Sequence, residues 1–130
     1  MTVRQFSDAI LNHRLLWRAG FMLSLAAIAW LAFTSQPYPV PAFTSDKLNH
    51  FIAFTELAVI IRLGWPALHL AIPFLTLLSF GLAIELGQAM VSYRHFSMAD
   101  LGADVAGIVV GFCLFPIIRY IQENPATSKH

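Results

Sequence analysis

The sequence predicts an all-α polytopic membrane protein, a bundle of four transmembrane helices. Hydrophobic residues make up 58% of its 130 residues, charged residues only 12%, and the mean hydropathy is +0.68. A soluble domain of this size has too little interior to bury so much apolar surface. The apolar residues also fall into four runs, each long enough to cross the hydrocarbon core of a bilayer as a helix.

The four predicted spans form a single membrane domain. They cover residues 15–34, 46–65, 67–90 and 101–121. Between the first two spans, Pro37, Pro39 and Pro41 favour an extended loop. Pro66 begins the third element, and Pro73 is expected to kink that helix or bend its first turns.

The two ends of the chain are polar. Residues 1–14 are basic and form a short segment that is suited to lie on the membrane, and residues 122–130 form a tail. A basic start before an apolar run is also typical of a signal peptide. Because three further apolar runs follow, and no persuasive cleavage site precedes Gln36, we expect an uncleaved first helix.

Basic residues predict the orientation, since four spans place both termini on one side. Six lie on the side of the termini and two on the other: Arg4, Arg14, Arg18, Arg62, Arg119 and Lys129 against Lys47 and Arg94. This bias places both termini in the cytoplasm, in a multi-pass protein of the cytoplasmic membrane whose partners are membrane lipids. A net charge of +1 without a basic stripe argues against nucleic-acid binding. The single Cys113 excludes an intrachain disulfide.

Ionisable and amide side chains are concentrated at the ends of three predicted helices. They are Asp46, Lys47 and His50 in the second span, Glu85 and Gln88 in the third, Arg94 and His95 in the following turn, and Asp100 and Asp104 at the start of the fourth. Helical spacing places them on common faces, since Asp100 and Asp104, like Asp46 and His50, are four residues apart. The predicted topology brings these ends to the outer membrane face, where we expect one polar cluster.

Glu85 and Asp104 give the strongest indication of function. Glu85 is five residues before the end of its predicted span, which places it roughly 8 Å below the membrane surface. A carboxylate at such a depth costs about 2–3 kcal/mol on insertion scales unless it is paired or hydrated, so these groups are functional candidates by default.

Some members of the cluster have structural explanations as well. Asp46 and Asp100 also suit helix N-caps, Lys47 a snorkelling anchor and His95 an ordinary loop position. Glu56, near the middle of the second span, is expected to reach a water or a partner inside the bundle, and we assign it no further role.

Three glycines share helix faces with these acids. Gly81 precedes Glu85 by four residues, and Gly107 and Gly111 follow Asp104 on one face of the fourth span. Small residues let helix backbones approach closely in membranes, so we interpret these positions as packing contacts.

The order of these polar residues resembles that of the VanZ-like family of small membrane proteins. The resemblance rests on Asp-Lys-x-x-His-Phe at residues 46–51, Glu85-x-x-Gln88, Arg94 and Asp100, and it covers residues 46–111. It implies four spans, a place in the cell envelope and a link to resistance to the glycopeptide teicoplanin. Where the family usually has Asn, this chain has Asp104.

Three classes of function fit the cluster. The first is an enzyme acting on a phosphate-bearing lipid or a lipid-linked cell-wall precursor. Its catalytic residues would be His50, as general base or nucleophile, with Glu85, Asp104 and Asp100. Its substrate-binding residues would be Lys47, Arg94, Gln88 and Asp46, since guanidinium and ammonium groups bind phosphate. The second class is a module that binds such a molecule without turnover, and the third is a polar network that only ties helix ends together.

No cofactor is required by these readings. A variant of the enzyme has His50, Glu85 and Asp104 holding a divalent ion. One histidine with scattered carboxylates is a weak ligand signature, so this variant is the less favoured one.

Overall fold

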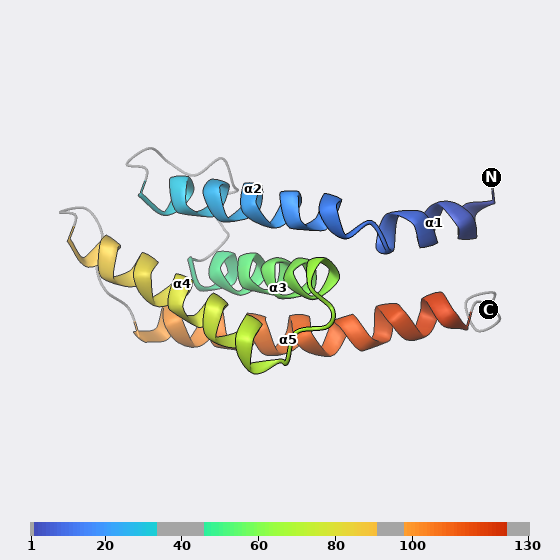
Figure 1. Cartoon of the computed structure of the whole chain (residues 1–130). Coiled ribbons are helices and arrows are strands. Elements are labelled where there is room, and N and C mark those ends of the chain that lie inside the picture. Colours follow the sequence, from blue (N-terminus) through green and yellow to red (C-terminus); the bar gives the residue numbers. More distant parts are fainter. Residues whose placement is uncertain (1, 34–45, 91–97, 125–130) are drawn as a thin grey trace.

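The computed structural model describes residues 2–33, 46–90 and 98–124, and only the backbone of Asp46. These residues form five helices, α1 (Val3–Leu11), α2 (Arg14–Phe33), α3 (Asp46–Gly64), α4 (Ala71–Ala89) and α5 (Met98–Glu123), and no strand (Figure 1). The all-α prediction is therefore confirmed. The predicted proline loop, the turn that contains Arg94 and His95, and the end of the tail lie outside the described residues.

Three of the five helices, α2, α4 and α5, are long and apolar enough to cross a membrane. They support the prediction of a membrane protein. Helix α3 has 19 residues, as α4 does. It differs in composition, because it contains Asp46, Lys47, Glu56 and Arg62.

Helix α3 is the central helix of the bundle. The helix lies between α2 and α5 in Figure 1, with α4 alongside, and its most extensive contacts are with α5. It supplies four members of the buried apolar core: Phe54, Leu57, Ala58 and Ile61. Phe21 of α2, Leu77 of α4 and Ile108 of α5 complete this core. Neighbouring helices thus bury the apolar residues of α3, whereas Lys47 and Glu56 remain exposed and Arg62 is half-buried.

Two glycines of α5 allow its close contact with α3. A Cβ atom on Gly107 would lie 2.5 Å from the carbonyl oxygen of Phe51, and one on Gly111 would lie 2.7 Å from that of Thr55. Both neighbours are backbone atoms, which cannot turn away as a flexible side chain can. The prediction of a glycine packing face is confirmed for these two positions.

Helix α4 begins at Ala71, four residues later than the predicted start of the third span at residue 67. The intervening turn is closed by hydrogen bonds from Leu68 N to Trp65 O and from Ile72 N to His69 O. Pro73 falls in the first turn of α4, where its missing N–H removes no bond within the helix.

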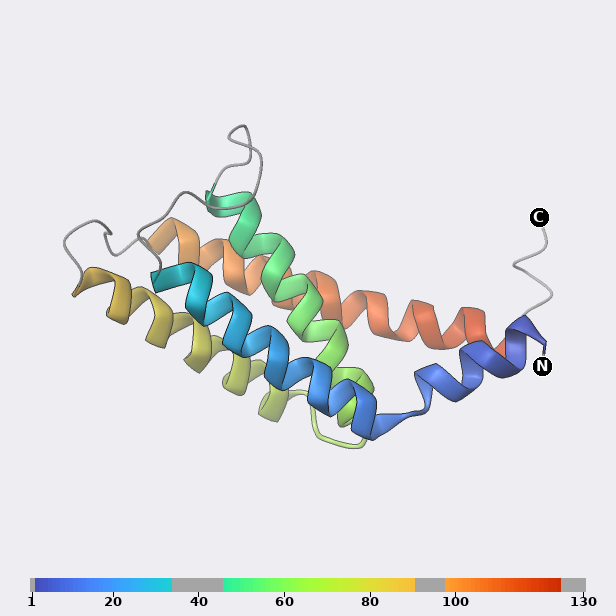
Figure 2. The same ribbon diagram turned by 90° about the horizontal axis from the view of Figure 1, so that it is seen from above.

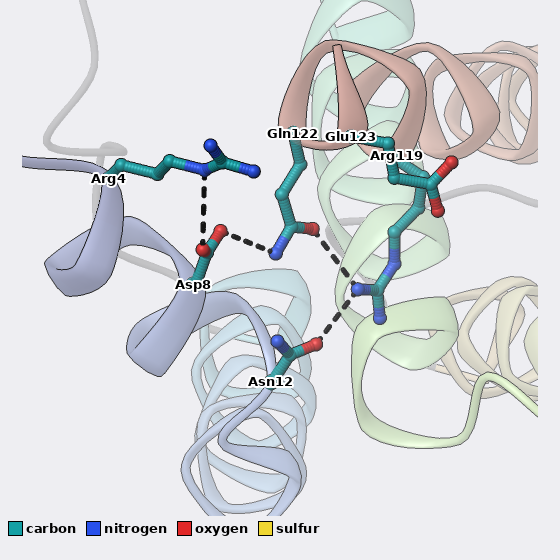
Figure 3. A pocket seen from close by; sticks show the side chains of 6 residues that line it. All are labelled: Arg4, Asp8, Asn12, Arg119, Gln122 and Glu123. Carbon is teal, nitrogen blue, oxygen red and sulfur yellow. Dashed lines mark hydrogen bonds and ion pairs between the residues drawn. The ribbon is translucent and has the colours of Figure 1, made fainter. Parts of the chain in front are cut away.

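The ends of α1 and α5 meet at the opposite end of the molecule from the polar cluster (Figure 2). Asn12 accepts a hydrogen bond from Arg119 at 3.0 Å, and Asp8 accepts one from Gln122 at 3.0 Å (Figure 3). Helix α5 extends to Glu123 and has 26 residues, a length of about 39 Å that exceeds a bilayer core. Its last two turns provide these hydrogen-bond partners, Arg119 and Gln122.

Helix α1 is amphipathic and has an N-terminal capping box, in which the Thr2 hydroxyl accepts from Gln5 N and the Gln5 side chain accepts from Thr2 N. Its polar side chains Arg4 and Asp8 line the hollow shown in Figure 3. Its apolar side chains Val3 and Phe6 are 83% and 56% exposed. This arrangement suits a helix that lies along a membrane surface, as the sequence predicted for this segment.

We expect Gly107→Ala to destabilise the bundle, because the added methyl group meets the backbone of α3. The cost should be about 1–3 kcal/mol, as for other overpacked sites, and it should appear as a lower melting temperature of the purified protein in detergent. Gly102→Ala on the same helix is the matched control, since a Cβ there meets nothing within 4 Å. Equal melting temperatures for the two variants would contradict the close contact between α3 and α5.

Candidate functional site

The centre of the candidate site is a hydrogen bond between α3 and α5. His50 Nδ1 and Asp104 Oδ1 are 2.7 Å apart. An ionised carboxylate accepts the Nδ1–H proton in such a pair, so the pair favours the tautomer with an unprotonated Nε2. The bond therefore orients the imidazole and determines which nitrogen is available for chemistry.

Two further carboxylates face the other nitrogen. Glu85 Oε1 of α4 and Asp100 Oδ2 of α5 each lie 3.8 Å from His50 Nε2. These separations are too long for direct hydrogen bonds. Both carboxylates are therefore close to Nε2 without a direct hydrogen bond to it.

Burial differs across the cluster. Glu85 and Asp104 are fully buried, whereas the side chains of His50 and Asp100 remain 16% and 15% exposed. The deeper acids are thus enclosed by the helices, and the imidazole and Asp100 form the edge that can be reached from outside.

Gly81 makes room for the buried Asp104. A Cβ atom on Gly81 would lie 2.7 Å from Asp104 Oδ2 and 3.2 Å from the ring of Phe54. Asp104 Oδ2 is buried without a hydrogen-bond partner among the described residues. Gly81 therefore serves the site as well as helix packing, a role that its helical spacing from Glu85 did not reveal.

The chemistry available to the cluster is proton transfer and cation binding. An imidazole oriented by a carboxylate is a common general base. An imidazole with one nitrogen bonded to a carboxylate and the other open is equally the usual form of a metal-binding histidine. Both uses need the same orientation of His50.

The other predicted site residues have different positions. Gln88 donates from Nε2 to Ala32 O at 2.9 Å, so its buried amide ties α4 to α2. Lys47 is exposed on the first turn of α3. Asp46 begins α3, but its side chain is outside the described part of the chain, and so is all of Arg94.

Glu56, which the sequence left without a partner, accepts a hydrogen bond from Ser24 of α2 at 3.2 Å. This contact links α2 to α3 away from the cluster. Glu56 is therefore a useful comparison for the cluster acids, because it is a carboxylate on the same helix as His50.

Sequence and structure comparisons add no relative, since no protein-family model, curated protein or solved structure matches the chain.

The hydrogen bond to Asp104 should control the tautomer of His50. In the wild type and in Asp104→Asn, an oxygen accepts from Nδ1–H, so both proteins should show the Nδ1–H tautomer by ¹⁵N NMR of labelled histidine. In the nearly isosteric Asp104→Leu the acceptor is gone, and the Nε2–H tautomer should grow. The His50 signal is assigned by its loss in His50→Gln. An unchanged tautomer in Asp104→Leu would show that the bond does not orient the ring.

Proposed function

We propose that this chain is a four-span protein of the cytoplasmic membrane that acts on a phosphate-bearing lipid or lipid-linked cell-wall precursor. The observation that carries the proposal is the oriented imidazole: His50 bonded to buried Asp104 through Nδ1 and open toward Glu85 and Asp100 through Nε2. In this proposal His50 is the general base. Glu85 and Asp100 border the position of the reacting group.

In the proposed topology α3 crosses the membrane together with α2, α4 and α5, and the cluster lies at the outer face. Two observations support it. α3 is as long as α4, and it packs against α2, α4 and α5. Three arginines lie at the end of the bundle where α1 meets α5. Arg18 donates a hydrogen bond to Gly64 O at the end of α3. Arg62 and Arg119 both lie over the ring of Phe115. This basic end is the cytoplasmic one in the proposal.

The substrate class follows from charge and from the family resemblance. Lys47 lies one turn before His50, and Arg94 lies in the segment that joins α4 to α5. Such cations suit a phosphate or pyrophosphate group. The resemblance to VanZ-like proteins supports an envelope substrate and a role in tolerance of glycopeptides such as teicoplanin.

In the proposed reaction, a water or hydroxyl oxygen attacks the phosphorus atom and loses its proton to His50 Nε2. The bond from phosphorus to the leaving oxygen breaks, and this oxygen takes a proton from Glu85 or Asp100. Asp104 stabilises the imidazolium that forms, because its carboxylate already accepts from Nδ1–H. Each protein group then returns to its starting state by proton exchange with solvent.

The topology can be tested with reporters. A reporter fused after His130 should be active as a cytoplasmic fusion, and one inserted at Tyr38 should be active as an external fusion. The physical basis is the excess of Lys and Arg at the end with the termini. The reverse pattern would place the cluster at the cytoplasmic face and remove the proposed envelope substrate.

The site can be tested by comparing activity and stability on the same purified variants. His50→Ala and Glu85→Gln should each abolish teicoplanin tolerance and conversion of a lipid-linked precursor, while melting temperature and membrane content remain near those of the wild type. Glu56→Gln is the matched control and should retain activity, because it removes a carboxylate of α3 outside the cluster.

A purely structural network predicts a different result. Removing one partner of a buried charge pair typically costs about 3–5 kcal/mol, so expression and stability would collapse together with activity. Joint loss of this kind, or full activity in His50→Ala, would refute the proposed site. Binding of the precursor without product would favour a binding module over an enzyme.

A further inference from the structure

The geometry points to a divalent-cation site formed by His50 Nε2, Glu85 and Asp100, with a transition metal such as Zn²⁺ or Mn²⁺ as its ligand. The inference keeps the proposed substrate class, on which it rests for the purpose of the ion, and names a cofactor for the same site. It replaces the general-base role of His50 and the proton-donor role of Glu85 or Asp100, because a metal-bound Nε2 cannot accept a proton and a metal-bound carboxylate has none to donate. It goes beyond the sequence, which favoured a site without metal and would have used Asp104 as a direct ligand.

The first argument is the arrangement of the three side chains. One ligand atom from each of His50, Glu85 and Asp100 lies within 4.8 Å of the other two. Nε2 is 3.8 Å from both Glu85 Oε1 and Asp100 Oδ2. An ion centred among atoms at such separations lies about 2.1–2.5 Å from each, which is the range of metal–ligand bonds in proteins.

The second argument is independent of these distances and comes from Asp104. This fully buried carboxylate is directed at the imidazole and bonds Nδ1 at 2.7 Å, while its Oδ2 has no hydrogen-bond partner in the described part of the chain. Histidines that bind metals almost always donate their other N–H to a carboxylate or carbonyl in this way, which raises the basicity of the binding nitrogen. Asp104 would thus hold the ligand without binding the ion.

The identity of the ion follows from the ligands. Imidazole nitrogen suits zinc and other transition metals, and carboxylate oxygens suit manganese and magnesium. One nitrogen with two carboxylates therefore favours Zn²⁺ or Mn²⁺ over Ca²⁺. Three protein ligands leave a coordination position open, as in catalytic rather than structural zinc sites. A phosphate oxygen or a water would reach such an ion past His50 and Asp100, the two ligands whose side chains are partly exposed.

The test uses the full chain purified in detergent, stripped with a chelator and then titrated with Zn²⁺ or Mn²⁺. We expect about one ion per chain by mass spectrometry, and a rise in melting temperature on loading because the ion binds the folded state. Glu85→Gln and Asp100→Asn should each weaken binding at least tenfold. Asp104→Leu should weaken it about 10–100-fold through the lost second contact of the imidazole. Glu56→Gln should bind as the wild type does.

A spectroscopic measurement identifies the histidine. With Mn²⁺ bound, pulsed EPR should show coupling to a histidine nitrogen that disappears in His50→Gln. Absence of stoichiometric binding would overturn the inference, and so would full binding by the double variant Glu85→Gln/Asp100→Asn or bound Mn²⁺ without nitrogen coupling. If chelator-treated protein converts a lipid-linked precursor at full rate, the ion has no catalytic role, and the proposed function remains supported. If the ion binds stoichiometrically but no precursor is converted, the metal site is supported and the proposed reaction is refuted.

Discussion

The close approach of α3 and α5 is the constraint on which the rest of the structure depends. Gly107 and Gly111 bring the backbone of α5 against the carbonyl groups of Phe51 and Thr55. One and two turns before Gly107 on the same helix lie Asp104 and Asp100. The contact that packs the two helices therefore also sets the distance at which Asp104 meets His50. A larger spacing would separate these groups, and both would then have to satisfy their charges elsewhere.

Helix α3 unites the packing and the chemistry of the molecule. Its C-terminal half contributes Leu57, Ala58 and Ile61 to the apolar core, and its N-terminal half carries His50. The apolar helices α2, α4 and α5 pack against this helix, while Leu48, Ile52 and Glu56 remain exposed. Glu85 of α4 and Asp104 of α5 are fully buried close to His50, an environment in which an oriented imidazole, or an ion, has a large electrostatic effect.

Much of the fold could be predicted from the sequence, because apolar runs and proline positions report directly on helices and their ends. The proximity of His50, Glu85, Asp100 and Asp104 could also be anticipated, since it needs only helical spacing and successive helices that run antiparallel. The atoms through which these groups contact one another could not be predicted. Helical spacing alone does not say that Asp104 takes Nδ1 and that Glu85 and Asp100 face Nε2, because this depends on helix rotation and depth. For the same reason the sequence placed Gln88 among the binding residues, whereas its amide bonds Ala32. The hydrogen bond from Gln122 to Asp8 of α1 depends on α5 continuing past Ile121, which a hydropathy pattern does not reveal.

The missing side chain at Gly81 has a consequence for how related sequences can vary. The carboxylate of Asp104 occupies the volume that a methyl group at position 81 would need. Positions 81 and 104 are thus coupled by space although they are on different helices. A chain that acquires a side chain at the first position must shorten or turn the residue at the second, and the histidine then loses its anchor. A substitution at Gly81 would in this way change which nitrogen of His50 carries the proton.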